Sequence, residues 1–135
     1  MVTNIVRQFW QTCATGEYQH LRPMLADDLK VIWPTSHEYY QGPDAFIAVN
    51  EAFGPNWCYQ ILTLEQVDAQ QAISVVHVSK AGWPDSFYAT SVFQFVELRI
   101  QTMTTYWAFQ DKQPEWRIGL SEVYDPKADF LETSE

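Results

Sequence analysis

Cysteine and positive charge are both scarce in this sequence of 135 residues. The two cysteines, Cys13 and Cys58, lie far apart and form no CxxC spacing, so neither a disulfide framework nor a common zinc motif is present. Eight Lys and Arg stand against seventeen Asp and Glu, a formal net charge of −9. Because affinity for phosphate groups depends on Lys and Arg displacing counterions, neither nucleic acid nor an anionic membrane is expected as a partner.

Long hydrophobic runs are also missing, and a secretory leader is not expected. The apolar stretches fall far short of the ~20 residues that cross a bilayer. The start, Met1-Val2-Thr3-Asn4, lacks the charged-then-apolar layout of a signal peptide, so we expect a reduced, cytoplasmic setting. With 47% hydrophobic residues, the chain is expected to form one domain over 1–124, followed by an acidic, mobile tail over 125–135.

Aromatic residues, by contrast, are abundant. Phe, Trp and Tyr make up 16% of the chain, and six of these residues are Trp. Such side chains carry a large apolar area and, in Trp and Tyr, one polar atom. Their excess predicts an aromatic-lined cavity, an interface, or both.

The first part of the chain has the spacing of helices. An apolar stripe from Ile5 to Cys13, followed by Gly16 as a left-handed cap, predicts a first helix. A second, short helix is predicted over 17–26, and 29–33 is typical of a strand. A third helix is predicted over 43–53, because proline suits a first helical position and the following Gly-Pro stops the last turn.

The second part has the pattern of strands. Four segments rich in Val, Ile, Thr and aromatic residues predict a strongly curved antiparallel meander over 57–67, 72–80, 86–95 and 100–110. Both faces of the later strands carry apolar groups, since Phe93 and Phe95 alternate with Val92 and Val96. A sheet of this kind is buried on both sides. We expect helices on one face and a second subunit on the other, which gives a homodimer through the sheet.

The order of these elements resembles the nuclear-transport-factor-2-like fold, and its SnoaL-like members most closely, over about residues 3–118. The resemblance rests on Phe9-Trp10 with Thr15-Gly16-Glu17, Leu25-Ala26-Asp27-Asp28, Gly42-Pro43-Asp44-Ala45-Phe46, Asn50-Glu51-Ala52-Phe53, Tyr106-Trp107-Ala108 and Pro114-Glu115-Trp116-Arg117. It implies an α+β cone, in which three N-terminal helices pack on a strongly curved, mostly antiparallel sheet and enclose an apolar pocket. Because this scaffold hosts isomerases, dehydratases, cyclases, epoxide hydrolases and non-enzymatic binders, the polar groups in the pocket decide the function.

The resemblance argues against one known chemistry. Ketosteroid-isomerase-like members use a tyrosine of the first helix as oxyanion donor and an aspartate before the first-strand proline as base. Matching Gly16 and Pro34 to that pattern places Phe9 and Trp33 at these two positions. Since Phe9 cannot donate a hydrogen bond and Trp33 cannot accept a proton, that mechanism is not expected.

A zinc site and a cofactor are not expected either. Residues 37–41 differ by one letter from the HExxH zinc helix, but Gln41 replaces the second histidine. Gly42 and Pro43 follow at once, where the zinc helix would have to continue.

Two histidines are candidates for acid–base chemistry. His77 shares a strand face with Ile73 and Val75, so it enters the pocket if that face is concave; the alternative is a hydrogen-bonded core or interface histidine. His37 follows the first strand, near the place where pockets of this family open, with Glu38 beside it. The alternative for His37 is a solvated loop residue.

Six aromatic residues are the predicted pocket lining, because bulky rings with one donor each can enclose a flat molecule and orient its polar edge: Trp10, Trp33, Trp57, Tyr88, Tyr106 and Trp107. About half of them are expected to face the ligand. The alternative is an ordinary aromatic core with a dimer interface.

Three hypotheses for the function follow. The first is a homodimer whose aromatic pocket binds a small apolar or aromatic organic molecule. The second is a cofactor-independent isomerase, cyclase or dehydratase that uses His77 or His37 as acid or base. The third is an interaction module that binds another protein through the exposed face of its sheet.

Overall fold

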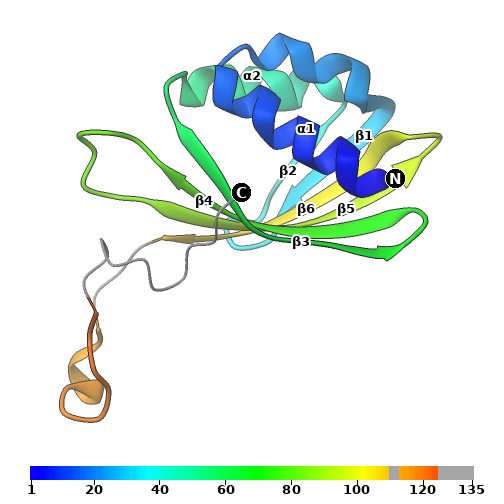
Figure 1. Cartoon of the computed structure of the whole chain (residues 1–135). Coiled ribbons are helices and arrows are strands. Elements are labelled where there is room, and N and C mark those ends of the chain that lie inside the picture. Colours follow the sequence, from blue (N-terminus) through cyan, green and yellow to red (C-terminus); the bar gives the residue numbers. More distant parts are fainter. Residues whose placement is uncertain (110–112, 125–135) are drawn as a thin grey trace.

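Three helical segments lie on one face of a six-stranded sheet in the computed structural model of the chain, which describes residues 1–109 and 113–124 (Figure 1). The elements are α1 (Val2–Thr15), the 3₁₀ helix η1 (Tyr18–Met24), β1 (Leu25–Trp33), β2 (Glu38–Gln41), α2 (Pro43–Phe53), β3 (Cys58–Asp68), β4 (Gln71–Ser79), β5 (Phe87–Val96), β6 (Arg99–Phe109) and the 3₁₀ turn η2 (Glu115–Arg117). The expected α+β architecture is confirmed. The predicted tail, 125–135, lies outside the described residues.

Helix α1 buries the predicted apolar stripe and ends at the predicted cap. Phe9, Trp10 and Cys13 are buried, and Gly16 has φ 78°, the left-handed conformation that glycine adopts without strain. A Cβ atom at Gly16 would lie 2.9 Å from the Cβ of Pro55. The glycine therefore both ends the helix and lets the loop after α2 pack closely against it.

The second helix and the first strand differ from the prediction. A helix over 17–26 is expected from the sequence, but η1 is a 3₁₀ helix that contains Pro23 and ends at Met24. Proline has no N–H to continue an α-helical ladder, which favours the short 3₁₀ form. Strand β1 consequently begins at Leu25, four positions before the predicted start, and its pairing with β6 shifts register between Leu25 and Lys30.

The sheet has the order β2-β1-β6-β5-β4-β3. Strands β3 to β6 form the predicted antiparallel meander. Strand β1 lies beside β6 in parallel, with β2 antiparallel at the outer edge, so the sheet is mixed. The first and last strands along the chain, β1 and β6, thus lie side by side.

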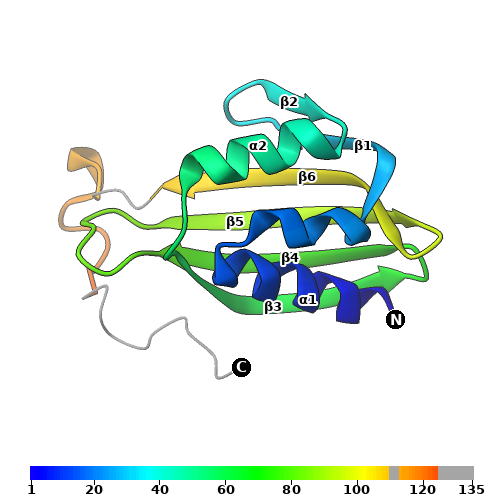
Figure 2. The same ribbon diagram turned by 90° about the horizontal axis from the view of Figure 1, so that it is seen from above.

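The helices divide the sheet into two different faces. Helix α1 contacts β3 and β4, whereas α2 contacts β1 and β2 on the same face (Figure 2). We call this covered side the inner face and the opposite side the outer face. The alternation of buried residues along β4 shows which residues belong to each: Ala72, Ser74, Val76 and Val78 are buried on the inner face, and Ile73, Val75 and His77 are half-buried on the outer face.

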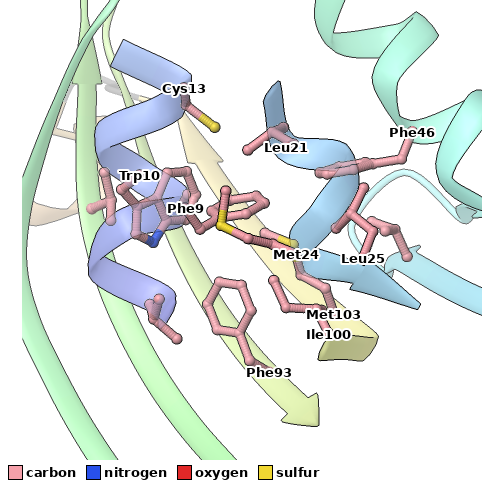
Figure 3. Close-up of a cluster of buried hydrophobic side chains, with 14 of the residues drawn as sticks. Phe9, Trp10, Cys13, Leu21, Met24, Leu25, Phe46, Phe93, Ile100 and Met103 are labelled. Carbon is pink, nitrogen blue, oxygen red and sulfur yellow. The ribbon is translucent and has the colours of Figure 1, made fainter. Parts of the chain in front are cut away.

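An aromatic and aliphatic core joins the helices to the inner face (Figure 3). The ring of Phe9 lies at its centre, with ring centroids 4.9 Å from Trp10, 5.6 Å from Phe93 and 6.1 Å from Phe46. Trp10 satisfies its buried N–H by donating from Nε1 to Ser74 Oγ at 3.1 Å. No helix in the described part of the chain is long and apolar enough to cross a membrane.

Candidate ligand-binding cavity

A cavity of about 650 Å³ lies between the two α-helices and the inner face of the sheet. Because α1 packs over one half of the sheet and α2 over the other, the floor between them is formed mainly by β6. The cavity is lined by Phe9, Trp10, Cys13, Trp33, Thr35, Ser36, Glu38, Phe46, Val49, Asn50, Ala52, Phe53, Tyr59, Phe87, Met103, Thr105, Trp107 and Phe109.

Half of the lining residues are aromatic. The rings of Trp33 and Trp107 meet edge to face with centroids 5.7 Å apart, and Tyr40 packs on Trp33 at 4.7 Å. Further along, Phe53, Phe87 and Phe109 complete the lining. Such rings provide wide, stiff, apolar surfaces that suit a flat organic molecule.

Tyr59 on β3 is a polar group in this apolar wall. Its hydroxyl lies 3.0 Å from the hydroxyl of Tyr18, which in turn donates to the carbonyl oxygen of Gly54 at 2.8 Å. Burial raises the pKa of Tyr59 far above its ordinary value, so the phenol stays protonated at any physiological pH. Tyr59 therefore acts as a neutral hydrogen-bonding group.

Glu38, at the start of β2, is the one carboxylate among the described lining residues. The hydroxyl of Ser36 donates to its Oε1 at 2.6 Å, and the hydroxyl of Tyr40 donates to Oε2 at 3.3 Å. These two donors hold the carboxylate beside Trp33, on which Tyr40 packs. A carboxylate held in this way can accept a further hydrogen bond or a proton.

The remaining polar groups in the wall are mostly satisfied or neutral. Thr105 shares a buried hydrogen bond with Ser91 at 2.9 Å, and Asn50 donates from Nδ2 to the carbonyl of Phe46 at 2.8 Å. Burial raises the pKa of the Cys13 thiol well above its ordinary range, which disfavours the nucleophilic thiolate. Trp107 Nε1 is buried and has no hydrogen-bond partner among the described residues.

Neither candidate histidine lines the cavity. The prediction that His77 enters the pocket required the face of Ile73 and Val75 to be the concave one. That face is the outer one, where the His77 ring packs on Tyr88 with centroids 4.9 Å apart. His37 is exposed in the loop between β1 and β2, with φ 61°, and it is flanked by two residues that do line the cavity. A one-residue step along a strand turns a side chain to the other face, which separates His77 from the cavity. His37 is separated because it lies in the turn between β1 and β2 and has left-handed backbone.

Three of the six predicted aromatic residues line the cavity: Trp10, Trp33 and Trp107. Trp57 is buried behind the wall, where it stacks on Phe53 with centroids 4.3 Å apart. Tyr88 and Tyr106 lie on the outer face, where Tyr106 is 47% exposed.

Phe9 and Trp33, at the positions of the ketosteroid-isomerase donor and base, both line the cavity. At the positions that the resemblance assigns to them, Phe9 has no donor for an oxyanion and Trp33 cannot accept a proton. Among the described residues, no three His, Cys, Asp or Glu side chains gather as metal ligands.

Glu38 and Tyr59 are two polar lining residues that were not among the residues predicted to line the pocket. Glu38 had a weak signal, since it lies beside His37 in the loop expected to border the pocket. Tyr59 had none, because its role depends on Tyr18, which is 41 positions away in sequence. Only the folded chain brings the hydroxyl of Tyr18, on η1, to that of Tyr59, near the start of β3.

Comparisons with known proteins agree with this architecture. Residues 2–119 match the family model of the SnoaL-like domain. A ketosteroid isomerase candidate from Kribbella flavida is 17% identical and has a TM-score of 0.79, over 98% of this chain and 93% of that one. An NTF2-like protein of unknown function from Burkholderia xenovorans is 18% identical with a TM-score of 0.74, over 92% of this chain and 95% of that one.

An LEH-like epoxide hydrolase from M. tuberculosis is 13% identical with a TM-score of 0.63, over 79% of this chain and 82% of that one. At these identities the solved structures establish the fold alone. No curated protein matches the sequence. Because the family model covers nearly the whole chain, the protein belongs to the SnoaL-like domain family.

Proposed function

We propose that this protein binds a small, flat, largely apolar organic molecule in the cavity between α1, α2 and β6. The observation that carries the proposal is the cavity itself, about 650 Å³ in volume and lined mainly by aromatic and aliphatic side chains. Ligand sites in proteins typically enclose about 300–1,000 Å³ and combine an apolar wall with a few polar groups. Tyr59 and Glu38 provide such groups here.

The six tryptophans offer a direct test of where a ligand binds. In ¹⁵N-labelled protein each indole N–H gives one resonance, and Trp10, Trp33 and Trp107 line the cavity whereas Trp83 and Trp116 are 57% and 74% exposed outside it. Titration with naphthalene, a flat apolar probe, is expected to shift the first three resonances and leave the last two in place. Shifts of Trp83 and Trp116 alone would show binding elsewhere and contradict the proposal.

A matched pair of variants on α2 checks the location independently. Ala52 lines the cavity and Ala48 does not, although both are exposed positions on the same helix. Ala52→Phe is expected to weaken naphthalene binding by roughly tenfold, which corresponds to about 1.4 kcal/mol, because the ring occupies ligand space. Ala48→Phe should bind the probe like the unmodified protein; equal affinities in both variants would count against the cavity.

The alternative function is a cofactor-independent isomerase, cyclase or dehydratase. Its support is Glu38, a carboxylate that lines the cavity and could remove a proton from a carbon acid. The test is deuterium exchange at the α-carbon of 2-tetralone in D₂O, followed by NMR. Exchange that the protein accelerates, that Glu38→Gln abolishes and that Glu65→Gln on β3 retains would favour the enzyme; exchange at the rate of buffer alone would reject this chemistry.

We further propose that a second copy of the chain covers the outer face. The face carries half-buried apolar side chains, among them Ile73, Val75 and Val92, which no element of the described chain covers. Closed two-fold pairing would bury them. Sedimentation velocity at micromolar concentration is expected to give the mass of a dimer, and a monomer at all concentrations would remove the proposal.

A further inference from the structure

Tyr59 of the cavity wall, Tyr18 behind it and the carbonyl of Gly54 form a chain of three oxygen atoms that contains two protons. Tyr18 is 2% exposed on η1, and its hydroxyl donates to the carbonyl oxygen of Gly54 at 2.8 Å. A carbonyl oxygen only accepts, so this bond uses the single proton of Tyr18. The 3.0 Å contact between the two hydroxyls must then use the proton of Tyr59.

This proton count fixes the polarity of the cavity wall at Tyr59. With its proton directed to Tyr18, the Tyr59 oxygen has only lone pairs left for a ligand. The reverse direction would require Tyr18 to donate its proton to Tyr59. The part-buried carbonyl oxygen of Gly54 would then have lost its hydrogen-bond donor, which is unfavourable. The phenol oxygen is thus an acceptor with a fixed orientation, the opposite of an oxyanion-binding donor.

A second acceptor lies toward the opposite edge of the sheet. Glu38 belongs to β2 and Tyr59 to β3, the two edge strands of the sheet, and both line the cavity. Ser36 and Tyr40 use one lone-pair position on each oxygen of Glu38, and a carboxylate has about four. Glu38 can therefore accept another hydrogen bond.

Two donors in the wall are used within the protein. Trp10 Nε1 donates to Ser74, and Asn50 Nδ2 donates to the carbonyl of Phe46. Trp107 Nε1 has no partner but is buried. Trp33 and Thr35, near Glu38, keep donors that no hydrogen bond of the described residues uses. The clearest acceptor without a free donor beside it is therefore Tyr59, where Trp10 already donates to Ser74.

On the basis of the proposed function, we propose that the cavity selects flat apolar molecules that carry a hydroxyl or N–H group, such as phenols, over the corresponding ethers and ketones. A ligand donor pairs with Tyr59 or Glu38, whereas an ether or carbonyl oxygen placed at Tyr59 meets only lone pairs. Buried polar groups left unpaired in this way are the strongest source of discrimination between ligands of similar shape.

The experiment compares naphthalene, 2-naphthol and 2-methoxynaphthalene, three probes with one ring system. Their dissociation constants are measured from the indole resonances of Trp10, Trp33 and Trp107. 2-Naphthol is expected to bind at least ~10-fold more tightly than its methyl ether, the factor that one hydrogen bond of about 1.4 kcal/mol supplies. Equal affinities, or tighter binding of the ether, would overturn the inference.

Two variants separate hydrogen bonding from the size of the methyl group. Tyr59→Phe removes the acceptor, so the affinity for 2-naphthol should fall toward that for the ether, while the ether is unaffected. Tyr18→Phe frees the proton of Tyr59, so the ether should gain affinity and the preference should shrink. A preference that persists in Tyr59→Phe and in the Tyr59→Phe/Glu38→Gln double variant would be steric and would contradict the inference.

Tyr106→Phe on the outer face is the matched control and should leave all three affinities unchanged. If Tyr18→Phe is unfolded by circular dichroism, the Tyr59→Phe variant alone decides. Failure of the two proposals is distinguishable. When no probe shifts the cavity indoles, the proposed binding function is wrong; when naphthalene and both derivatives bind there with one affinity, binding stands and the preference for donors is wrong.

Discussion

The inner and outer faces of the sheet are made by the same alternating strands, yet they differ in what covers them. On the inner face, α1, η1 and α2 bury residues such as Phe93 and leave the cavity over β6. On the outer face, neighbours such as Val92 remain half-buried and uncovered by the described chain. Apolar side chains occur on both sides, so their presence alone does not tell a core from a pocket or an interface. The difference is made by the helices.

The largest expected change in unfolding free energy comes from a comparison of two adjacent residues of β5. Phe93 is fully buried on the inner face and packs on Phe9, so Phe93→Ala is expected to cost roughly 3–5 kcal/mol of unfolding free energy. Val92→Ala on the outer face should cost about 1 kcal/mol or less if the chain is a monomer. Urea denaturation measures both.

A cost for Val92→Ala as large as that for Phe93→Ala, and dependent on protein concentration, would show that the outer face is also a buried interface. In that case the variant should also shift the sedimentation coefficient toward that of the monomer. This outcome would break the contrast between the faces and support the proposed dimer.

A smaller change in unfolding free energy is expected from a comparison of two serines of β4. Ser74 accepts the buried hydrogen bond from Trp10 Nε1, so Ser74→Ala leaves that N–H unpaired and is expected to cost roughly 1–3 kcal/mol. Ser79 lies on the outer face, and Ser79→Ala should change the stability by about 0.5 kcal/mol or less. If thermal unfolding gave equal losses for both, the hydrogen bond of Trp10 would not contribute as described.

The smallest expected effect is a pH dependence. Burial holds the pKa of the Cys13 thiol above its ordinary value of 9.0, so the unfolded chain loses this proton at lower pH than the folded chain. The contribution of the protonated thiol to the unfolding free energy is fully present below pH 9.0. Above pH 9.0 the unfolding free energy decreases, by at most about 1.4 kcal/mol per pH unit for one group.

Cys13→Ala should therefore flatten the fall in unfolding free energy between pH 9 and pH 10, measured by urea denaturation, whatever its effect at neutral pH. The matched variant Cys58→Ala changes an exposed thiol and should leave the slope unaltered. An unchanged slope in Cys13→Ala would show that the thiol is accessible to water in the folded protein.

Much of the fold could be predicted from local patterns. The stripe of α1, the Pro43 start of α2 and the meander of β3 to β6 each follow from residue spacing, and each is confirmed. The exception, η1, depends on how Pro23 interrupts an α-helical ladder, for which spacing provides no clear signal. The parallel pairing of β1 with β6 joins segments far apart in the chain, and nothing in the sequence predicted it.

The candidate site was only partly predictable. Trp10, Trp33 and Trp107 were expected to line the pocket and do line the cavity, but Tyr88 and His77 lie on the outer face. A strand with apolar groups on both sides does not reveal which side the helices cover. The choice between adjacent residues of one strand depends on tertiary packing.

By itself, the sequence determined an acidic, aromatic-rich α+β domain whose elements follow from periodicity, because those signals are local to each segment. Only the tertiary structure decided which face of the sheet is inner, and hence which aromatic rings enclose the cavity. It also decided that the proton of Tyr59 is directed to Tyr18, since that direction depends on Gly54, 36 residues away from Tyr18. The physical reason is that a hydrogen bond and a buried face are properties of neighbours in space, which the order of residues along the chain does not specify.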